Sequence, residues 1–183
     1  MYYSIQSDDD NYANFFPENH SIELVKSFRG VSLIENWKPI HFKLMKKKDK
    51  RPIADIMTAC IPICSRKVYE AIRSVCEGCV EFLPCTIGEE KMDYYVMNVL
   101  SVTDAIDYTR SSYQRFSPEG RIMSFEKIIF KDDVQYPIFK IADLLLGYIF
   151  CSETLKGLLE SIGANGVLFS SALFSKQDSQ QLK

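Results

Sequence analysis

The alternation of apolar and polar positions along the chain predicts several β-strands. Ile40–Leu44 alternates apolar with polar side chains, which is typical of a half-buried strand. Tyr94–Leu100 is rich in aromatic and β-branched residues, which favours a central strand. Val80–Pro84 is expected to be a strand that ends at its proline, because proline cannot donate a ladder hydrogen bond. Ile122–Phe130 is expected to be a further strand, with a turn at Asp132-Asp133.

A helical pattern begins after Ser65. The Ser65 hydroxyl can cap a helix by accepting a hydrogen bond from an amide of the first turn, which otherwise has no partner. Four apolar residues then recur with the spacing of one helix face: Val68, Ala71, Ile72 and Val75. Gly78 lies where this helix is expected to stop.

This pattern occurs twice in the chain. Ile63-Cys64-Ser65 recurs as Phe150-Cys151-Ser152, 87 residues further on, and the match continues without a gap. The matched apolar positions are Val68 with Leu155, Ile72 with Leu159, Val75 with Ile162, Val80 with Val167, and Phe82 with Phe169. Upstream, Pro52-Ile53 has a counterpart in Pro137-Ile138. Each copy therefore predicts a short strand, a serine-capped helix, a glycine-containing turn and a second strand.

The repeat also predicts the fold class. A unit this small cannot bury its apolar helix face alone, so the two copies are expected to pack on a common sheet. The expected fold is α+β, a mixed sheet with a duplicated strand–helix–strand unit at about 52–86 and 137–172. The chain of 183 residues suits a single domain, 1–183. Residues 1–20 lack clear periodicity and are expected to be a variable, loosely attached N-terminal arm, and residues 173–183 a polar tail.

Composition narrows the class of protein. Apolar residues make up 46% of the chain and charged residues 25%, and the 12 Phe and 10 Tyr supply ample surface for a core, so a wholly disordered chain is excluded. The longest nearly uncharged apolar stretch, Ile141–Cys151, falls short of the ~20 residues of a membrane span. The chain opens Met1-Tyr2-Tyr3-Ser4, without the basic and apolar regions of a secretion signal, so a cytoplasmic location is expected.

Cysteines are the first candidates for chemistry. Six cysteines without a secretion signal are expected to be reduced thiols, and five of them cluster: Cys60, Cys64, Cys76, Cys79 and Cys85. Cys76-Glu77-Gly78-Cys79 has the spacing of a zinc knuckle or a redox pair. The second copy, however, has Gly163 and Gly166 at the corresponding positions, where no metal could be held. We therefore expect buried thiols that serve as small core residues, with no bound metal.

The histidines and glycines suggest no catalytic machinery. The chain has only His20 and His41, and His41 is expected to be an exposed strand residue. Neither lies in a serine or cysteine motif, so a nucleophile with an adjacent base has little support. No phosphate-binding glycine loop is present, and no cofactor is expected.

Asp104 and Asp107 are the remaining candidates for catalysis. They are three residues apart, a spacing that could place both carboxylates on one helix face. The simpler expectation is that Asp104 caps a helix after Val102-Thr103, while Asp107 is solvated or paired with Arg110. The sequence therefore predicts no catalytic residue.

A run of basic residues offers one possible binding site. Five of the six residues from Lys46 to Arg51 are basic, although the net charge of the chain is −2. Such a run can bind nucleic acid or another anion, or it can be a solvated loop between a strand and a helix. Because no aromatic residues alternate with these charges to stack on bases, the solvated loop is favoured and nucleic acid is not an expected partner.

Several segments, taken in order, resemble one protein family. They are Phe28-x-Gly30-x-x-Leu33 with Trp37-x-Pro39, the two serine-capped units that begin at Ile63 and Ile149, Val80–Pro84, Asp93–Leu100, Asp104–Asp107 with Ser111, and Gly163-x-x-Gly166-Val167-x-Phe169. Together they resemble immunity-protein family eleven of bacterial polymorphic toxin systems, once catalogued as a domain of unknown function. The resemblance covers roughly residues 28–172, which form the family-like core.

The resemblance implies a function by binding. It implies a small cytoplasmic immunity protein, or antitoxin, that binds a cognate toxin domain and blocks it, with no catalytic or partner-binding residue to carry over. Two alternatives remain open. One is an enzyme of an unrecognised class that uses the Asp104 and Asp107 region or a cysteine. The other is a nucleic-acid-binding regulator that uses Lys46–Arg51.

Overall fold

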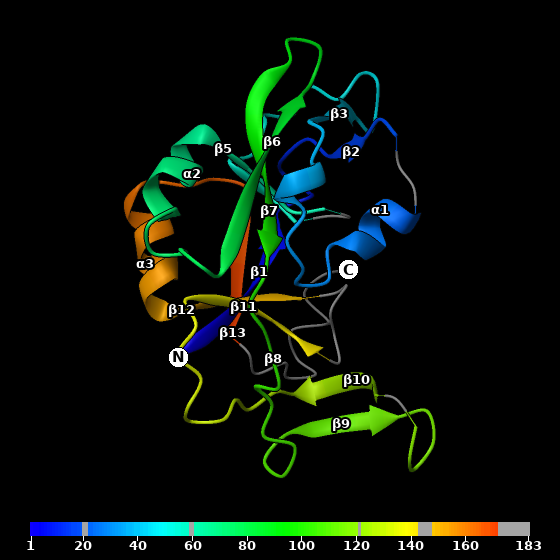
Figure 1. Ribbon diagram of the computed structural model, residues 1–183, viewed down its shortest axis with the longest axis vertical. Coiled ribbons are helices and arrows are strands. Elements are labelled where there is room, and N and C mark those ends of the chain that lie inside the picture. Colours follow the sequence, from blue (N-terminus) through cyan, green and yellow to red (C-terminus); the bar gives the residue numbers. More distant parts are fainter. Residues whose placement is uncertain (20–21, 59–60, 121, 143–147, 172–183) are drawn as a thin grey trace.

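Strands dominate the computed structural model, which describes residues 1–19, 22–58, 61–120, 122–142 and 148–171. Within these ranges the strands form a six-stranded sheet, a five-stranded sheet and a two-stranded hairpin (Figure 1). The strands are β1 Tyr2–Ser7, β2 Phe15–Pro17, β3 Ile40–Leu44, β4 Ile56–Met57, β5 Ile63–Ser65, β6 Val80–Ile87, β7 Met92–Val99, β8 Val102–Thr103, β9 Ser112–Arg115, β10 Ile122–Lys127, β11 Ile138–Ile141, β12 Ile149–Ser152 and β13 Val167–Ser171. The helices are α1 Ile22–Ser27, α2 Arg66–Ile72 and α3 Glu153–Ser161, with the 3-10 helix η1 at Ile34–Asn36. The mixed sheets and the few helices agree with the expected α+β class. The two serine-capped units do not share one sheet as expected, because β5 belongs to the six-stranded sheet and β12 to the five-stranded sheet.

The six-stranded sheet has the order β2-β3-β6-β7-β5-β4. Its only parallel pair among the described strands is β3 with β6, and its other neighbours run antiparallel. β7 lies between β6 and β5, which confirms the prediction of a central strand at Tyr94–Leu100, and β3 confirms the strand predicted at Ile40–Leu44.

β6 corrects one prediction, because it continues through Pro84 to Ile87. The Pro84 carbonyl accepts a hydrogen bond from Trp37 Nε1 at 2.9 Å, so it points away from β7. The proline nitrogen points to the same side, where the pairing of β6 with β3 begins only at Cys85. Pro84 therefore leaves no gap in the ladder to β7, and the strand has no reason to end there.

The five-stranded sheet has the order β13-β1-β12-β11-β8, so β1 is an inner strand (Figure 1). The expectation that residues 1–20 form a loosely attached arm is therefore wrong. The partners of β1 are β12 and β13, about 145 to 170 residues away along the chain. Its consecutive residues Ser4 and Ile5 are both buried, so the strand shows no alternation that a sequence pattern could detect.

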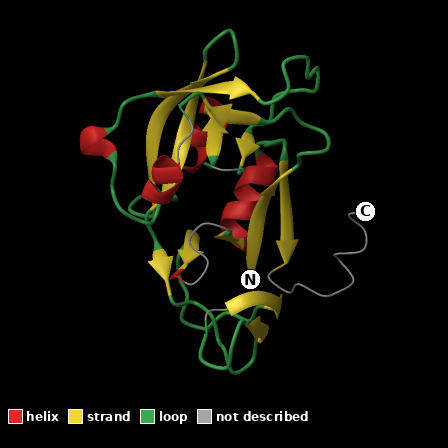
Figure 2. Ribbon diagram, turned by 90° about the vertical axis from the view of Figure 1, so that its right-hand side faces the viewer, coloured by secondary structure: helices red, strands yellow, loops and turns green. Residues whose placement is uncertain are grey.

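Both longer helices begin at the predicted serines. Ser65 Oγ accepts from the amide of Val68 at 3.4 Å, and Ser152 Oγ accepts from the amide of Leu155 at 3.2 Å. α2 ends at Ile72, earlier than its apolar pattern suggested, and Val75 in the following turn is 39% exposed. α2 and α3 lie side by side against the sheets (Figures 1 and 2).

Four strands have the same arrangement in both sheets. The order β4-β5-β7-β6 in one sheet matches β11-β12-β1-β13 in the other, and all these neighbours are antiparallel. In register, Ile56 and Ile138 lie opposite Cys64 and Cys151. The predicted upstream match of Pro52-Ile53 with Pro137-Ile138 is therefore shifted, and Ile56-Met57 is the segment that takes the place of Ile138-Phe139.

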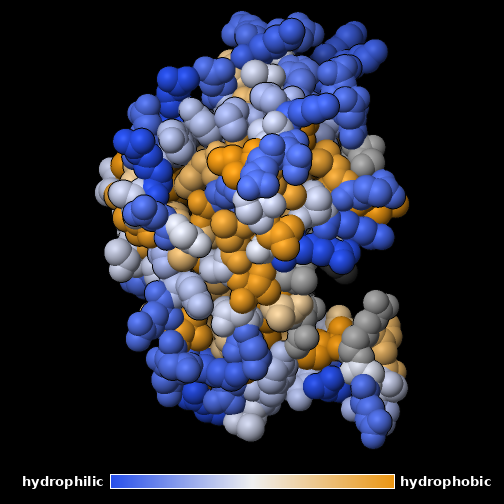
Figure 3. Space-filling model, viewed as in Figure 1, coloured by the Kyte–Doolittle hydropathy of each residue, from blue (hydrophilic) through white to orange (hydrophobic). Residues whose placement is uncertain are grey.

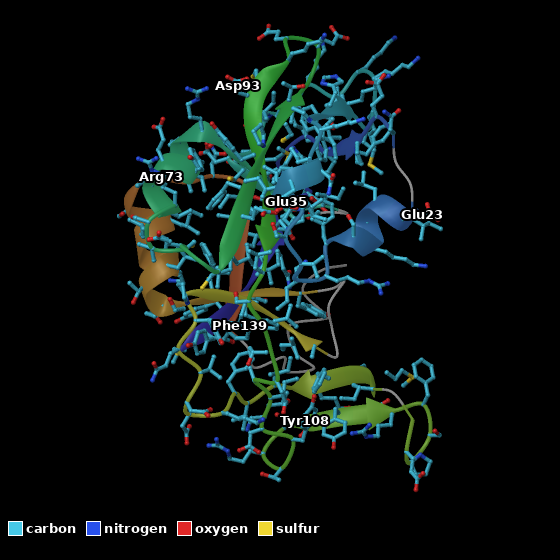
Figure 4. The ribbon with its side chains drawn as sticks, in the orientation of Figure 1. Glu23, Glu35, Arg73, Asp93, Tyr108 and Phe139 are labelled. Carbon is cyan, nitrogen blue, oxygen red and sulfur yellow. The ribbon has the colours of Figure 1, made fainter. Side chains whose placement is uncertain are left out.

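Three clusters of buried residues form the core. The first lies beneath α2 and α3 and draws on both sheets, and it includes Ile5, Cys64, Ile72, Met97, Cys151 and Leu159. The second covers the other face of the six-stranded sheet and includes Phe15, Phe28, Phe42, Leu83 and Val96. The third covers the other face of the five-stranded sheet and includes Ile106, Ile128, Phe139 on β11 (Figure 4) and Phe150.

The hairpin β9–β10 lies at one end of the long axis, opposite the β6–β7 turn (Figures 1 and 2). The Tyr113 ring packs on Phe125 and edge-on against Tyr108 at the hairpin base (Figure 4). β10 ends at Lys127, so the strand predicted over Ile122–Phe130 is shorter than expected, whereas Asp132-Asp133 does form a turn. The tail 173–183 lies outside the described residues. Among those that are described, no helix is long and apolar enough to cross a membrane.

Candidate functional site

A cleft of about 990 Å³ opens at the end of the molecule that carries the β6–β7 turn. Its walls are β2, β3, the loop that follows β3, and the β6–β7 turn, and Figure 3 shows this end covered largely by hydrophilic side chains. The lining residues are Ala13, Phe15, Phe16, His41, Lys43, Leu44, Met45, Lys47, Asp49, Lys50, Arg51, Ile53, Gly88, Glu89, Glu90 and Met92. The cleft therefore combines an apolar part with charged walls.

The apolar part of the cleft belongs to the second core cluster. Phe15 is 9% exposed, and Leu44, Ile53 and Met92 pack against that cluster while remaining partly exposed. Met45, just beyond the end of β3, is 64% exposed at the edge of the cleft. Apolar side chains thus line the cleft because the strands that bury one face in the core also reach its wall.

One wall is the loop of residues 46–51, which we call the basic loop. Arg51 fixes its position. The guanidinium donates to Asp49 through Nε at 2.9 Å and Nη2 at 2.6 Å, and through Nη1 to the carbonyls of Asp9 and Asp10. The hydrogen bonds from Arg51 lower the pKa of Asp49 to about 2, and the Asp49 side chain is only 7% exposed. The loop is therefore tied to the Asp8–Tyr12 turn, and its expected loop structure is confirmed, although β4 rather than a helix follows it.

The Arg51 contacts do not involve the four lysines of the basic loop. Lys46, Lys47, Lys48 and Lys50 are exposed, and within the described ranges none of their ammonium groups lies in an ion pair. The single acid of the loop, Asp49, is already engaged by Arg51. The basic loop thus presents exposed ammonium groups that have no ion-pair partner among the described residues.

The facing wall is the β6–β7 turn, which carries Glu89 and Glu90. Both are exposed, and neither lies in an ion pair among the described residues. The turn depends on Gly88 at φ 71° and on Lys91 at φ 50°. Sequence reasoning missed these two glutamates because it ended the preceding strand at Pro84. The available signal was the polar segment Gly88-Glu89-Glu90-Lys91, whose glycine and charges are typical of a turn between two strands.

The two candidate aspartates are not brought together as a catalytic pair. Asp107 accepts from Arg110 Nε at 2.6 Å, which confirms the expected pairing, and from Thr109 Oγ1 at 2.6 Å. The hydrogen bonds from Thr109 and Arg110 hold the pKa of Asp107 well below its usual range. Asp104 pairs with Lys131 at 2.8 Å and caps no helix, because the chain after β8 is not helical.

The described cysteines are buried or half-buried free thiols spread over several elements: Cys64, Cys76, Cys79, Cys85 and Cys151. Burial raises the pKa of Cys76, Cys85 and Cys151 to about 12 in each case, which disfavours the thiolate that nucleophilic attack or metal binding requires. Among the described residues, no three His, Cys, Asp or Glu side chains are grouped as metal ligands. Cys60 lies outside the described residues.

His41 lies on β3 at the cleft. It is half-buried rather than exposed as predicted, and its Nδ1 lies 3.0 Å from Thr86 Oγ1 on the neighbouring strand β6. The hydrogen bond orients the imidazole toward a neutral hydroxyl. His20 lies outside the described residues.

Comparison with known proteins gives one result that bears on function. The family model described as "Immunity protein family (Imm11)" matches residues 16–173. The matched segment includes every element from α1 to β13 and the whole cleft wall from Phe16 onward. A search of curated proteins finds no match to the chain.

Proposed function

The chain belongs to the Imm11 immunity protein family, and from this premise we propose that it is an antitoxin that binds a cognate toxin domain and neutralises it by direct protein–protein contact. The family match over residues 16–173 is the observation that carries the proposal. We place the protein in a bacterial polymorphic toxin system and in the cytoplasm, where an immunity protein meets a toxin that reaches its own cell.

The geometry supports binding without catalysis. Asp104 and Asp107, the two carboxylates proposed for an enzyme, are each held by a different cation, Lys131 and Arg110. Inhibition by occlusion needs a well-packed scaffold with a surface complementary to its target, and a few anchor residues carry most of the binding energy. The three core clusters supply such a scaffold, and the cleft beside the basic loop offers such a surface.

The scaffold itself is, in our proposal, a duplicated unit at about 52–86 and 137–172. Two observations support it: the matching strand order, and the matching register of the inner strands, in which Ser65 lies opposite Tyr94 and Ser152 opposite Tyr2. The inner strands carry Tyr94-Tyr95 and Tyr2-Tyr3 at these equivalent positions. β1 would then be the last strand of the second copy, moved to the start of the chain. Residues 63–82 should superpose on residues 150–169, and a clearly different helix orientation in a crystal structure would contradict the duplication.

Growth rescue tests the function directly. Cells that express the toxin encoded beside this protein should stop growing, and co-expression of the protein should restore growth. The Asp104→Ala, Asp107→Ala double variant should rescue equally well, provided that circular dichroism shows an unchanged fold. If the native protein does not restore growth, the antitoxin proposal is wrong. If the purified protein turns over a substrate through these carboxylates, the enzyme alternative replaces it.

A further inference from the structure

The charge on the two walls of the cleft indicates what the cleft can accept. The basic loop carries five basic residues and one acid, Asp49, which forms an ion pair with Arg51. Lys47 and Lys50 line the cleft itself, while Lys43 on β3 is already paired with Glu18. The cleft therefore offers ammonium groups without an ion-pair partner among the described residues along one side, which favours an occupant with carboxylates on that side.

The apolar part of the cleft indicates that the occupant also carries an apolar side chain. Met45 is 64% exposed at the edge, and Leu44, Ile53 and Met92 are only partly covered. An apolar group seated against these residues would remove them from water and gain free energy in proportion to the area buried. Free phosphate or another small inorganic anion would make no use of this surface.

The charges on the two walls favour a polypeptide occupant over a nucleic acid. A sugar–phosphate backbone that followed the lysines would bring its charges toward Glu89 and Glu90 on the facing wall, where like charges repel. The cleft offers no platform for base stacking, since its aromatic residues Phe15 and Phe16 are buried or half-buried in β2. A peptide segment can meet both walls, with acidic residues toward the lysines and neutral or basic residues toward the glutamates.

From these observations we propose that the cleft between the basic loop and the β6–β7 turn is the docking site for an acidic segment of the toxin that carries a large apolar side chain. The proposal rests on the proposed function and names the surface and the chemistry of the partner for it. Because the Arg51 clamp holds the basic loop in place before the partner arrives, little of the binding free energy is lost in ordering that loop. The lysine charges steer the acidic segment in, and the apolar side chain anchors it.

Charge reversal at the basic loop tests the site. The probe is the purified toxin domain encoded beside this protein, in a catalytically inactive form, titrated against the full chain by isothermal calorimetry at two salt concentrations. The Lys47→Glu, Lys50→Glu double variant should bind roughly 10- to 100-fold more weakly than native protein and should lose most of the salt dependence of binding. Met45→Ala should weaken binding without changing its salt dependence.

A matched control changes the same charge elsewhere. Lys26→Glu with Lys127→Glu reverses two exposed lysines on α1 and β10, outside the cleft, and should bind the toxin within about threefold of native protein. Thermal melts must show that all variants fold; if the reversal variant does not, Lys47→Gln with Lys50→Gln replaces it and should still bind more weakly than the control.

The outcomes separate this proposal from the function on which it rests. If native protein does not bind the toxin, the proposed function fails. If native protein and the cleft variants bind the toxin equally, the function stands and the cleft is not the docking site. A 20-nucleotide DNA, single-stranded or duplex, serves as the other arm: native protein should not bind it, and salt-dependent binding lost on Lys47→Glu, Lys50→Glu would overturn the peptide proposal in favour of nucleic acid.

Discussion

Two regions of the molecule share one strand arrangement and carry different side chains at a half-buried position on the helix. Tyr69 on α2 and Lys156 on α3 each lie four residues after the capping serine. In the first region, Tyr69 stacks on Tyr95 with ring centroids 4.1 Å apart and contacts Phe82 edge-on at 5.2 Å. In the second, Lys156 Nζ lies 5.0 Å from the ring centroid of Tyr3 and 5.8 Å from that of Phe169. An aromatic ring in one region and an ammonium group in the other thus each lie against a pair of aromatic rings.

The charges around these two positions are also reversed. Arg73, beyond the end of α2 (Figure 4), lies over the Tyr69 ring at 5.9 Å. On α3, the carboxylates of Glu153 and Glu160 flank Lys156 at 4.0 and 2.9 Å. The buried positions beneath, such as Ile72 and Leu159, remain apolar in both regions. The comparison teaches that the buried positions keep the same apolar character in both regions, while the half-buried positions above them differ in charge and in aromatic character.

The largest effect should follow from removing the inner strand of the second region. Deletion of residues 1–7 exposes the ladder edges of β12 and β13 and removes Ile5 from the first core cluster, so the protein should not fold. Moving these residues to follow Ser171 through a short glycine-containing linker should restore folding, since Tyr3 already lies opposite Ser171. Circular dichroism and thermal melts compare the two. β7, the inner strand of the first region, pairs with both β5 and β6. A folded deletion variant would therefore show that β1 contributes less to folding than an inner strand should.

The next largest effect concerns the equivalent helix positions Ile72 and Leu159. Each side chain is 1% exposed, and each helix packs on the other. Ile72→Ala and Leu159→Ala should therefore each lower the free energy of unfolding by about 2–5 kcal/mol, measured by urea melts. Val75→Ala, at an exposed position after α2, is the control and should cost less than about 1 kcal/mol. A small loss at only one of the two sites would show that one helix is peripheral.

How much of this structure can be predicted from the sequence depends on how close together along the chain the interacting residues lie. The serine caps and the central strand β7 were predictable, because a hydroxyl before a helical pattern and a segment rich in aromatic and β-branched residues are short-range features. The place of β1 was not, because its partners lie at the other end of the chain and its buried residues do not alternate. Half of the cleft was predictable, since the basic loop is a visible charge run. The other half, Glu89 and Glu90, depends on a turn hidden by Pro84 inside a continuous strand.

A smaller effect concerns Asp55 and Pro137, the residues just before β4 and β11. The carbonyls of Asp55 and Pro137 each accept from the amide of their serine, Ser65 or Ser152, at 2.8 Å. Only Asp55 has a side chain that can also bind, and it accepts from Ser65 Oγ at 2.7 Å, Lys67 Nζ at 2.7 Å and the Asn165 amide at 3.1 Å. Burial alone would raise the pKa of Asp55, but these hydrogen bonds outweigh it and lower the pKa below its ordinary value.

The sign of the pH dependence follows from that lowered pKa. The contribution of Asp55 to stability is fully present above the unfolded-state pKa of about 4 and is lost as the pH falls through the folded-state pKa. Asp55→Asn should therefore cost about 1–3 kcal/mol at pH 7 and should flatten the decline in unfolding free energy between about pH 5 and pH 3. Asp93→Asn, which breaks the exposed pair with Arg66, is the control and should change little. An equally steep acid decline in Asp55→Asn would contradict the role of this carboxylate.

The last effect concerns the two half-buried helix positions, Tyr69 and Lys156, and the change at Lys156 should be the smallest of all. Tyr69→Ala removes a stacked and an edge-on ring contact, worth about 0.5–1.5 kcal/mol each, so a loss of about 1–3 kcal/mol is expected. Lys156→Ala removes a cation–π contact of a half-buried lysine and its ion pairs with two exposed glutamates, so its cost should stay below about 1 kcal/mol. Because salt screens the charges but not the ring contacts, melts in 1 M sodium chloride should shrink the Lys156 effect and leave the Tyr69 effect nearly unchanged. Lys156→Tyr should be tolerated, since the equivalent aromatic pair in the first region already accommodates a tyrosine. A loss above about 2 kcal/mol in Lys156→Tyr would mean that the two regions differ in backbone as well as in side chain at this position.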